Sequence, residues 1–157
     1  MSMPLVSIVV TTKNEERNIG RCLESVAVQS YPQEGIELIV VDNASTDHTQ
    51  EIARQYTPHV FIKGPERSAQ RNFGIITVAQ GKFAFYLDAD MIVAPGVVHS
   101  CVEYLQKRST LSALYISEVV LGARFWSRVR RFERSFYDGT VIDGVRFFRR
   151  TAFMQSG

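Results

Sequence analysis

The sequence predicts an α/β fold in which a mostly parallel, Rossmann-like sheet is flanked by helices. Short apolar runs alternate with stretches of helical periodicity over roughly the first 110 residues. Strands that alternate with helices favour parallel pairing, because each crossover is long and right-handed. The 157 residues are 45% hydrophobic with a formal net charge of +2, which suits a globular domain and argues against a disordered chain.

Four apolar runs predict the strands of this sheet. They are short, rich in β-branched or aromatic residues and bounded by polar residues, which is typical of strands buried on both faces. The first run is LVSIVVTT and the fourth is FAFYL. In chain order the predicted strands are residues 5–12, 36–41, 60–63 and 83–87.

Helices are predicted between these strands and after the last one. The first has apolar residues at helical spacing and acidic residues in its first turn. The second begins at Ser45 or Thr46, since either hydroxyl can act as its N-cap. Pro95 opens the fourth, because proline suits the first turn of a helix. In chain order the predicted helices are residues 15–29, 45–56, 68–79 and 95–107.

Carboxylates stand directly after the strands, where α/β sheets bind their ligands. Asp42 ends the second strand and can accept hydrogen bonds from a ligand edge such as a base N–H. Asp88 and Asp90 follow the fourth strand, and two hard oxygen ligands suit Mg²⁺ or Mn²⁺ together with substrate phosphates. A solvated turn explains D-x-D equally well by pattern alone, but its position after a buried strand favours a site.

Several other function classes lack their motifs. The sequence has no G-x-G-x-x-G after the first strand and no G-x-x-x-x-G-K-[ST], which argues against a dinucleotide dehydrogenase and a P-loop NTPase. Cys22 and Cys101 lie far apart in helix-like contexts and suit buried thiols. A nucleic-acid partner is not expected, because the carboxylates of the predicted site would repel phosphates. A nucleotidyltransferase is a lesser alternative, since its glycine-rich, lysine-bearing loop is missing.

Four motifs resemble, in order and spacing, those of the GT-A fold family 2 glycosyltransferases. They are SIVVTTKNEE at 7–16, VVDNASTDHT at 40–49, RSAQRNFG at 67–74 and YLDAD at 86–90. The resemblance implies an inverting, metal-assisted transfer of sugar from a nucleotide-diphosphate sugar, UDP- or GDP-linked, to an acceptor hydroxyl. It implies Mn²⁺ or Mg²⁺ held mainly by Asp90 beside Asp88. The substrate-binding residues that it implies are Thr11, Glu15, Asp42, Arg71 and Asp88.

The catalytic base is expected to lie beyond Gly157. In the family the base belongs to an acidic pair after a G-G-F-D-like stretch, and residues 141–157 resemble the segment that leads up to it. Asp143 is the substitute candidate. We therefore expect a truncated chain, with residues 1–117 as the donor-binding half and residues 118–157 as the incomplete start of an acceptor-side region. The alternative is a donor-binding fragment without transferase activity.

The second region differs from the first in charge. It carries eight basic and four acidic residues, against ten and twelve in residues 1–117. Residues 124–137 predict a basic amphipathic helix, which can dock on the sheet or lie in a membrane interface near a lipid-linked acceptor. We expect an acceptor glycan or lipid-linked acceptor and a cytoplasmic protein, at the membrane face in the second case. Truncation would expose apolar side chains and favour self-association, the residues being Phe147, Phe148, Phe153 and Met154.

Overall fold

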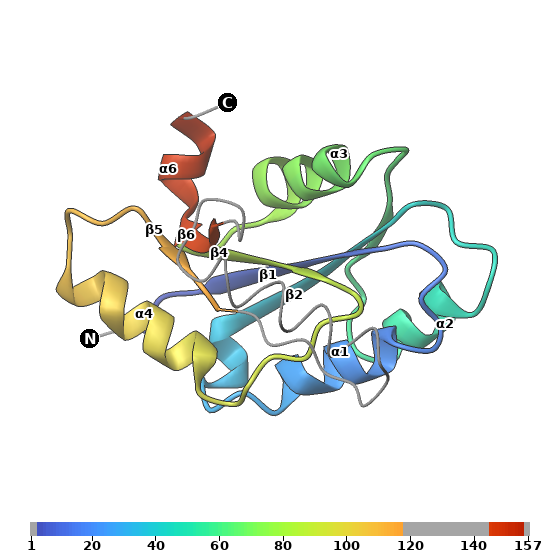
Figure 1. The fold of residues 1–157 in the computed structure, drawn as a ribbon, viewed down its shortest axis with the longest axis horizontal. Coiled ribbons are helices and arrows are strands. Elements are labelled where there is room, and N and C mark those ends of the chain that lie inside the picture. The colour runs from blue at the N-terminus through green and yellow to red at the C-terminus, as the bar shows by residue number, and fades with distance from the viewer. Residues whose placement is uncertain (1–2, 118–144, 156–157) are drawn as a thin grey trace, which may run out of the picture.

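A computed structural model describes residues 3–117 and 145–155, and it confirms the predicted α/β fold (Figure 1). The described strands form one sheet that is parallel except at one side. The strands are β1 (Val6–Thr12), β2 (Ile36–Asp42), β3 (Val60–Ile62), β4 (Phe83–Asp88), β5 (Ala113–Tyr115) and β6 (Val145–Arg149). The helices are α1 (Ile19–Ala27), α2 (Thr49–Arg54), α3 (Arg67–Asn72), α4 (Val97–Lys107) and α6 (Arg150–Gln155), with a 3₁₀ turn η1 (Gln33–Gly35) and a π-helix η2 (Phe73–Val78).

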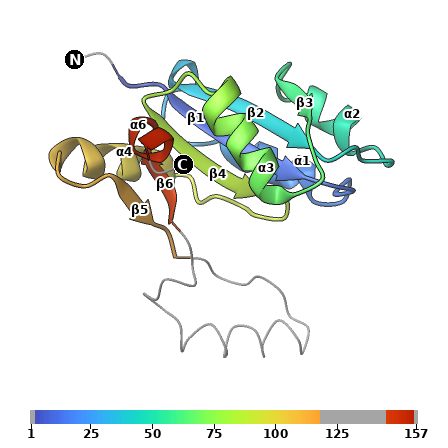
Figure 2. The same cartoon turned by 90° about the horizontal axis from the view of Figure 1, so that it is seen from above.

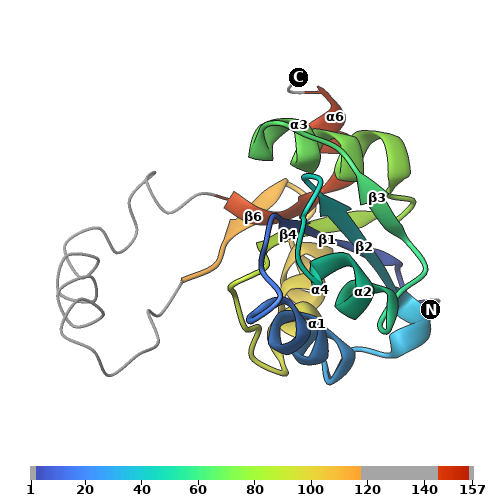
Figure 3. The same cartoon turned by 90° about the vertical axis from the view of Figure 1, so that its right-hand side faces the viewer.

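The sheet lies between two layers of helices, as Figure 3 shows. Its strand order is β3-β2-β1-β4-β6-β5, with β1 in parallel pairing with both β2 and β4. Every residue of β1 is buried, and successive side chains enter opposite layers. Val6, Ile8 and Val10 pack into the core beneath α1 and α4, whereas Val9 packs beneath η2. A strand of mostly apolar residues therefore suits this central position, which is buried on both faces.

Three predicted helix starts are wrong. The fourth helix begins at Val97, so Pro95 precedes it instead of opening it. The first two helices begin late because polar loops precede them. The first helix begins at Ile19 rather than residue 15, and residues 16–18 form a turn. The second begins at Thr49 rather than at Ser45 or Thr46, so neither of those two residues caps it. The Ser45 hydroxyl donates instead to the carboxylate of Asp42. Local side-chain bonds of this kind compete with helix formation and hold a loop.

The third predicted helix is present, but it changes type at its middle. Helix α3 continues as the π-helix η2, in which Gly74 lies against β1 and β2. A Cβ on Gly74 would come within 2.4 Å of Val9 Cγ1 and 3.2 Å of Val41 Cγ2. The close approach of this helix to the sheet therefore depends on the missing side chain.

The sequence did not predict β5 and β6. Strand β6 lies between β4 and β5 and is antiparallel to both. Figure 2 shows β6 beside β4. Phe147 and Phe148 are 0% and 4% exposed, so the expectation that truncation exposes them is wrong. Phe153 is partly buried and stacks on Phe148, while Met154 is exposed. The predicted helix at 124–137 lies outside the described residues, as does Asp143.

The two cysteines are buried free thiols, as predicted. Burial, with smaller effects from the charges of Asp90 and Asp88, raises the pKa of Cys22 to about 12. Within residues 3–117 and 145–155, no helix has the length and apolar character that crossing a membrane would need.

Candidate functional site

A pocket of about 380 Å³ opens at the carboxyl ends of β1, β2 and β4. The parallel register brings these ends to one edge of the sheet, where Thr12 pairs with Asp42 and Thr11 pairs with Asp88. The pocket brings together four predicted site residues, which are Thr11, Glu15, Asp88 and Asp90. The other lining residues are Thr12, Lys13, Asn43, Pro65, Arg67, Gln70 and Ala89.

Asp88 is the most heavily bonded acid of the pocket, and its side chain is 16% exposed. Its Oδ1 accepts hydrogen bonds from the Thr11 hydroxyl at 3.1 Å and from Arg71 Nη2 at 2.9 Å. Its Oδ2 lies 3.8 Å from Nη1 of Arg146 on β6. Burial by itself raises the pKa of Asp88, but the two arginines and Thr11 outweigh it and hold the pKa below its ordinary value. Asp88 is therefore an anion held in one orientation.

Arg71, Arg146 and Asp88 form a group of charged side chains that we call the Asp88 cluster. Arg71 is not among the residues that line the pocket. Its guanidinium lies 4.4 Å from the centroid of the Tyr86 ring, and that of Arg146 lies 5.3 Å from the same centroid. Two cations therefore share one aromatic ring and one carboxylate. Arg71, Arg146 and Asp88 together carry a net charge of +1, which the carboxylate of Asp90 in the following turn offsets.

Glu15 lies in the loop between β1 and α1, and its backbone fastens that loop to α2. Its N–H donates to Thr49 Oγ1 at 2.8 Å, while its side chain accepts from Asn18 Nδ2 at 2.7 Å. The side chain is half-buried at the pocket wall. Glu15 is thus both a loop anchor and a hydrogen-bond acceptor that a ligand can reach.

Asp42 is fully buried and does not line the pocket. Its Oδ2 accepts from the Ser45 backbone N–H and from Gln50 Nε2, each at 2.7 Å. Its Oδ1 accepts from the Ser45 hydroxyl. In this structure the carboxylate therefore holds the loop after β2, and that loop brings Asn43 to the pocket wall. Contact between Asp42 and a base remains a prediction.

The two carboxylates of the D-x-D motif differ in how freely they could bind a metal ion. Asp90 is exposed in the turn that follows β4, whereas Asp88 is paired with arginines. Among the described residues, no three His, Cys, Asp or Glu side chains cluster closely enough to hold a metal on their own. One or two carboxylates with the remaining ligands from substrate phosphates is the arrangement that Mg²⁺ and Mn²⁺ commonly use. The residues present fit that arrangement.

Sequence reasoning missed Arg146 as a neighbour of Asp88. No local pattern could have found this contact, because it depends on β6 inserting beside β4. It also passed over Gln70, which is 2% exposed and donates from Nε2 to the carbonyls of Thr12 and Val41 at 3.1 and 2.7 Å. A buried amide in a helix that faces two strand ends is the signal that could have indicated it.

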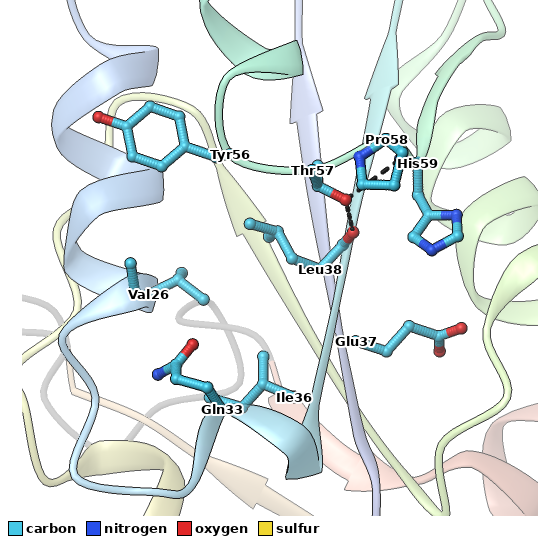
Figure 4. Close-up of a pocket in the computed structure, with 10 residues that line it drawn as sticks. Val26, Gln33, Ile36, Glu37, Leu38, Tyr56, Thr57, Pro58 and His59 are labelled. Atoms are coloured by element: carbon cyan, nitrogen blue, oxygen red, sulfur yellow. Dashed lines mark hydrogen bonds between the residues drawn. The ribbon is translucent and has the colours of Figure 1, made fainter.

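A second pocket of about 380 Å³ lies at the other end of the sheet, around the start of β2 and the residues before β3 (Figure 4). Val26, Leu38 and Tyr56 contribute to its wall, and the Thr57 hydroxyl donates to the Leu38 carbonyl at 2.7 Å. None of the predicted site residues lines this pocket. The predicted site residues that line either of these two pockets, Thr11, Glu15, Asp88 and Asp90, all line the first one.

Comparison with known families gives a match that spans most of the chain. The sequence model described as glycosyl transferase family 2 matches residues 7–156. A protein named glycosyltransferase AglE, from Haloferax volcanii, is 38% identical over 96 residues, which cover 57% of this chain and 31% of that protein. A beta-monoglucosyldiacylglycerol synthase from Nostoc sp. is 30% identical over 181 aligned positions, which cover 99% of this chain and 38% of that protein.

A solved structure shows the same fold. The mannosyltransferase PcManGT from Pyrobaculum calidifontis, in complex with GDP-Man and Mn²⁺, superposes with a TM-score of 0.74 at 23% identity. The superposition covers 100% of this chain and 48% of that one. The chain thus spans less than half the length of each of these three proteins.

Proposed function

Because the chain belongs to glycosyl transferase family 2, we propose that it forms the donor-binding part of an enzyme that transfers a sugar from a nucleotide-diphosphate sugar to an acceptor hydroxyl. The observation that carries the proposal is the pocket at the carboxyl ends of the strands. It gathers Thr11, Glu15, Asp88 and Asp90 from motifs that lie far apart in the sequence. A UDP- or GDP-linked donor is the proposed ligand, and the GDP-Man complex of the mannosyltransferase supports this class.

The proposed roles follow from where each side chain lies. The nucleoside would lie on the β2 side, near Glu15 and Asn43, and the diphosphate on the β4 side, where a metal ion at Asp90 would offset the charges of the carboxylates. Asp90, with Asp88 beside it, would hold Mn²⁺ or Mg²⁺, whose charge offsets that of the leaving diphosphate. Arg71 would act by holding Asp88 rather than by reaching into the pocket.

We propose an inverting transfer, in which a carboxylate base takes the proton of the acceptor hydroxyl as that oxygen attacks the anomeric carbon from the opposite face. The base itself stays a prediction made from the sequence, beyond Gly157 or at Asp143. An acceptor glycan or a lipid-linked acceptor is proposed, and the name of the Nostoc relative supports a lipid. A lipid acceptor would bring the protein to a membrane surface.

Calorimetric titration of the chain with UDP and GDP, in Mn²⁺ and again in EDTA, tests the donor site. We expect binding that is at least tenfold tighter with the metal, because the carboxylates would otherwise repel the diphosphate. A donor-hydrolysis assay on the same sample separates an active chain from a donor-binding fragment. Absence of binding to both nucleotides in Mn²⁺ and in Mg²⁺ would contradict the proposal.

A further inference from the structure

Thr12 carries a buried hydroxyl that no described residue satisfies. The residue is 4% exposed, it lines the pocket, and its Oγ1 has no hydrogen-bond partner within residues 3–117 and 145–155. Buried hydroxyls are almost always paired with protein, water or ligand, so an unpaired one at a pocket wall points to a bound partner. It therefore indicates where a ligand atom is recognised.

The neighbouring Thr11 differs in this respect. The Thr11 hydroxyl donates to Asp88 Oδ1 at 3.1 Å, and a hydroxyl has one proton to donate. The family resemblance assigns Thr11 to the nucleotide pocket. Its hydroxyl proton, however, is already donated to Asp88. The Thr11 oxygen can still accept a hydrogen bond, but only the Thr12 hydroxyl still has its proton to donate.

The backbone of Thr12 is fixed on the β2 side of the pocket. Its carbonyl accepts from the Asn43 N–H at 2.9 Å and from Gln70 Nε2 at 3.1 Å, and its Cα partner across the sheet is Asp42. Asp88 belongs to β4, which pairs with β1 on the opposite side from β2. Thr12 and Asp88 thus lie on neighbouring strands, and Thr11 rather than Thr12 is the residue directly beside Asp88.

We infer that the Thr12 hydroxyl donates a hydrogen bond to the nucleoside portion of the sugar donor, and that Thr12 rather than Thr11 is the threonine that donates to the nucleotide. The inference rests on the proposed function. Gln70 is the positioning residue in this arrangement, because its buried amide joins the ends of β1 and β2 beneath the nucleoside. Either a ribose hydroxyl or a base carbonyl or imine nitrogen supplies the polar atom that is needed.

The test compares Thr12→Val, which replaces the hydroxyl by a methyl of similar size, with Thr12→Ser, which keeps the hydroxyl. We expect Thr12→Val to weaken UDP or GDP binding roughly fivefold to tenfold, and Thr12→Ser to stay within about threefold of wild type. Without nucleotide, Thr12→Val should melt about 2–4 °C higher, because an unpaired buried polar group has been removed. A residue with only a structural role would lose stability and affinity together.

Two further ligands identify the atom that Thr12 meets. Pyrophosphate with Mg²⁺ should bind wild type and Thr12→Val equally, since it lacks a nucleoside. If 2′-deoxy-UDP shows no loss on Thr12→Val while UDP does, the partner is the ribose 2′-hydroxyl; equal losses place it elsewhere on the nucleoside.

The outcomes separate this inference from the function on which it rests. If wild type binds UDP or GDP and Thr12→Val binds it equally well, the inference alone is wrong. A loss of pyrophosphate binding equal to the loss of UDP binding also overturns it. Failure of wild type to bind either nucleotide overturns the proposed function together with the inference.

Discussion

At the scale of single residues, Asp88 controls the electrostatics of the site. It stands between Arg71 and Arg146, and its carboxylate also accepts the Thr11 hydroxyl proton. Breaking a partly buried pair by removing one partner leaves the other charges without compensation, which costs more than the pair contributes. The identity of Asp88 therefore affects stability as well as ligand binding.

The pH dependence of folding should report on this cluster. Because the folded-state pKa of Asp88 is lowered, its contribution to stability is present above the unfolded pKa of about 3.9 and is lost as the pH falls through the folded value. We expect Asp88→Asn to lower the free energy of unfolding by about 1–3 kcal/mol at pH 7. The difference from wild type should be smaller at pH 3 than at pH 7. Urea unfolding in EDTA at both pH values measures it, and a constant difference would contradict the assignment.

Replacing Asp90, unlike replacing Asp88, should affect ligand binding without affecting stability, because Asp90 is exposed. We expect Asp90→Ala to abolish the metal dependence of nucleotide binding while the melting temperature stays within about 2 °C of wild type. Calorimetry in Mn²⁺ and in EDTA measures the first effect and a thermal melt the second. Glu103→Ala is the matched control, since Glu103 is an exposed carboxylate on α4 that pairs only with Lys107 among the described residues. Metal-dependent binding that survives in Asp90→Ala would refute the metal assignment.

At the scale of elements, strands β1 to β4 could be predicted to within one or two residues. Each is a short apolar run, and the central strand β1 is buried at every residue, whereas β3 at the edge of the sheet is partly exposed. Strand β6 could not be predicted, because Arg146 and Arg149 interrupt its apolar residues, and β5 contributes only three residues. The helix starts after β1 and β2 failed for a different reason, since polar side chains there bond to loops.

The same distinction holds for the candidate site. The sequence shows where the strands end, and the parallel register brings those ends to one edge of the sheet. The grouping of four site residues could therefore be predicted, namely Thr11, Glu15, Asp88 and Asp90. The burial of Asp42 and the contact between Arg146 and Asp88 depend on long-range pairing, which the sequence does not display.

The π-helix η2 offers a direct test of packing against the sheet. Gly74→Ala would place a methyl group 2.4 Å from Val9 Cγ1, so we expect it to lower the free energy of unfolding by about 1–3 kcal/mol. Gly96→Ala is the control, because a Cβ there has nothing within 4 Å, and its effect should stay within about 0.5 kcal/mol. Urea unfolding of both variants decides the matter. Equal small effects would mean that the helix shifts away from β1 without cost.

At the scale of the whole molecule, β6 completes the sheet and its core. The Phe147 ring lies between those of Phe83 and Phe85, with centroids 5.7 and 5.8 Å away, and is fully buried. The two regions that the sequence distinguished by charge therefore share one hydrophobic core. Their proposed division into donor-binding and acceptor-side parts concerns function and remains a prediction.

Truncating Phe147 should test this dependence. We expect Phe147→Ala to destabilise the protein by about 3–5 kcal/mol, because the cavity would lie in the hydrophobic core, where Phe147 is fully buried. Met154→Ala, on the exposed face of α6, should change stability by less than about 0.5 kcal/mol. Chemical denaturation of the two variants gives the comparison. A loss below about 1 kcal/mol for Phe147→Ala would show that β6 is peripheral to folding.

The position of β6 also bears on how the protein folds as it is synthesised. Strands β4 and β5 both leave the ribosome before the strand that separates them in the finished sheet. Until residues 145–149 arrive, one side of β4 is an open edge whose backbone groups can pair with another chain. The nascent protein therefore passes through a stage at risk of aggregation, and that stage lasts at least as long as residues 89–144 take to be translated.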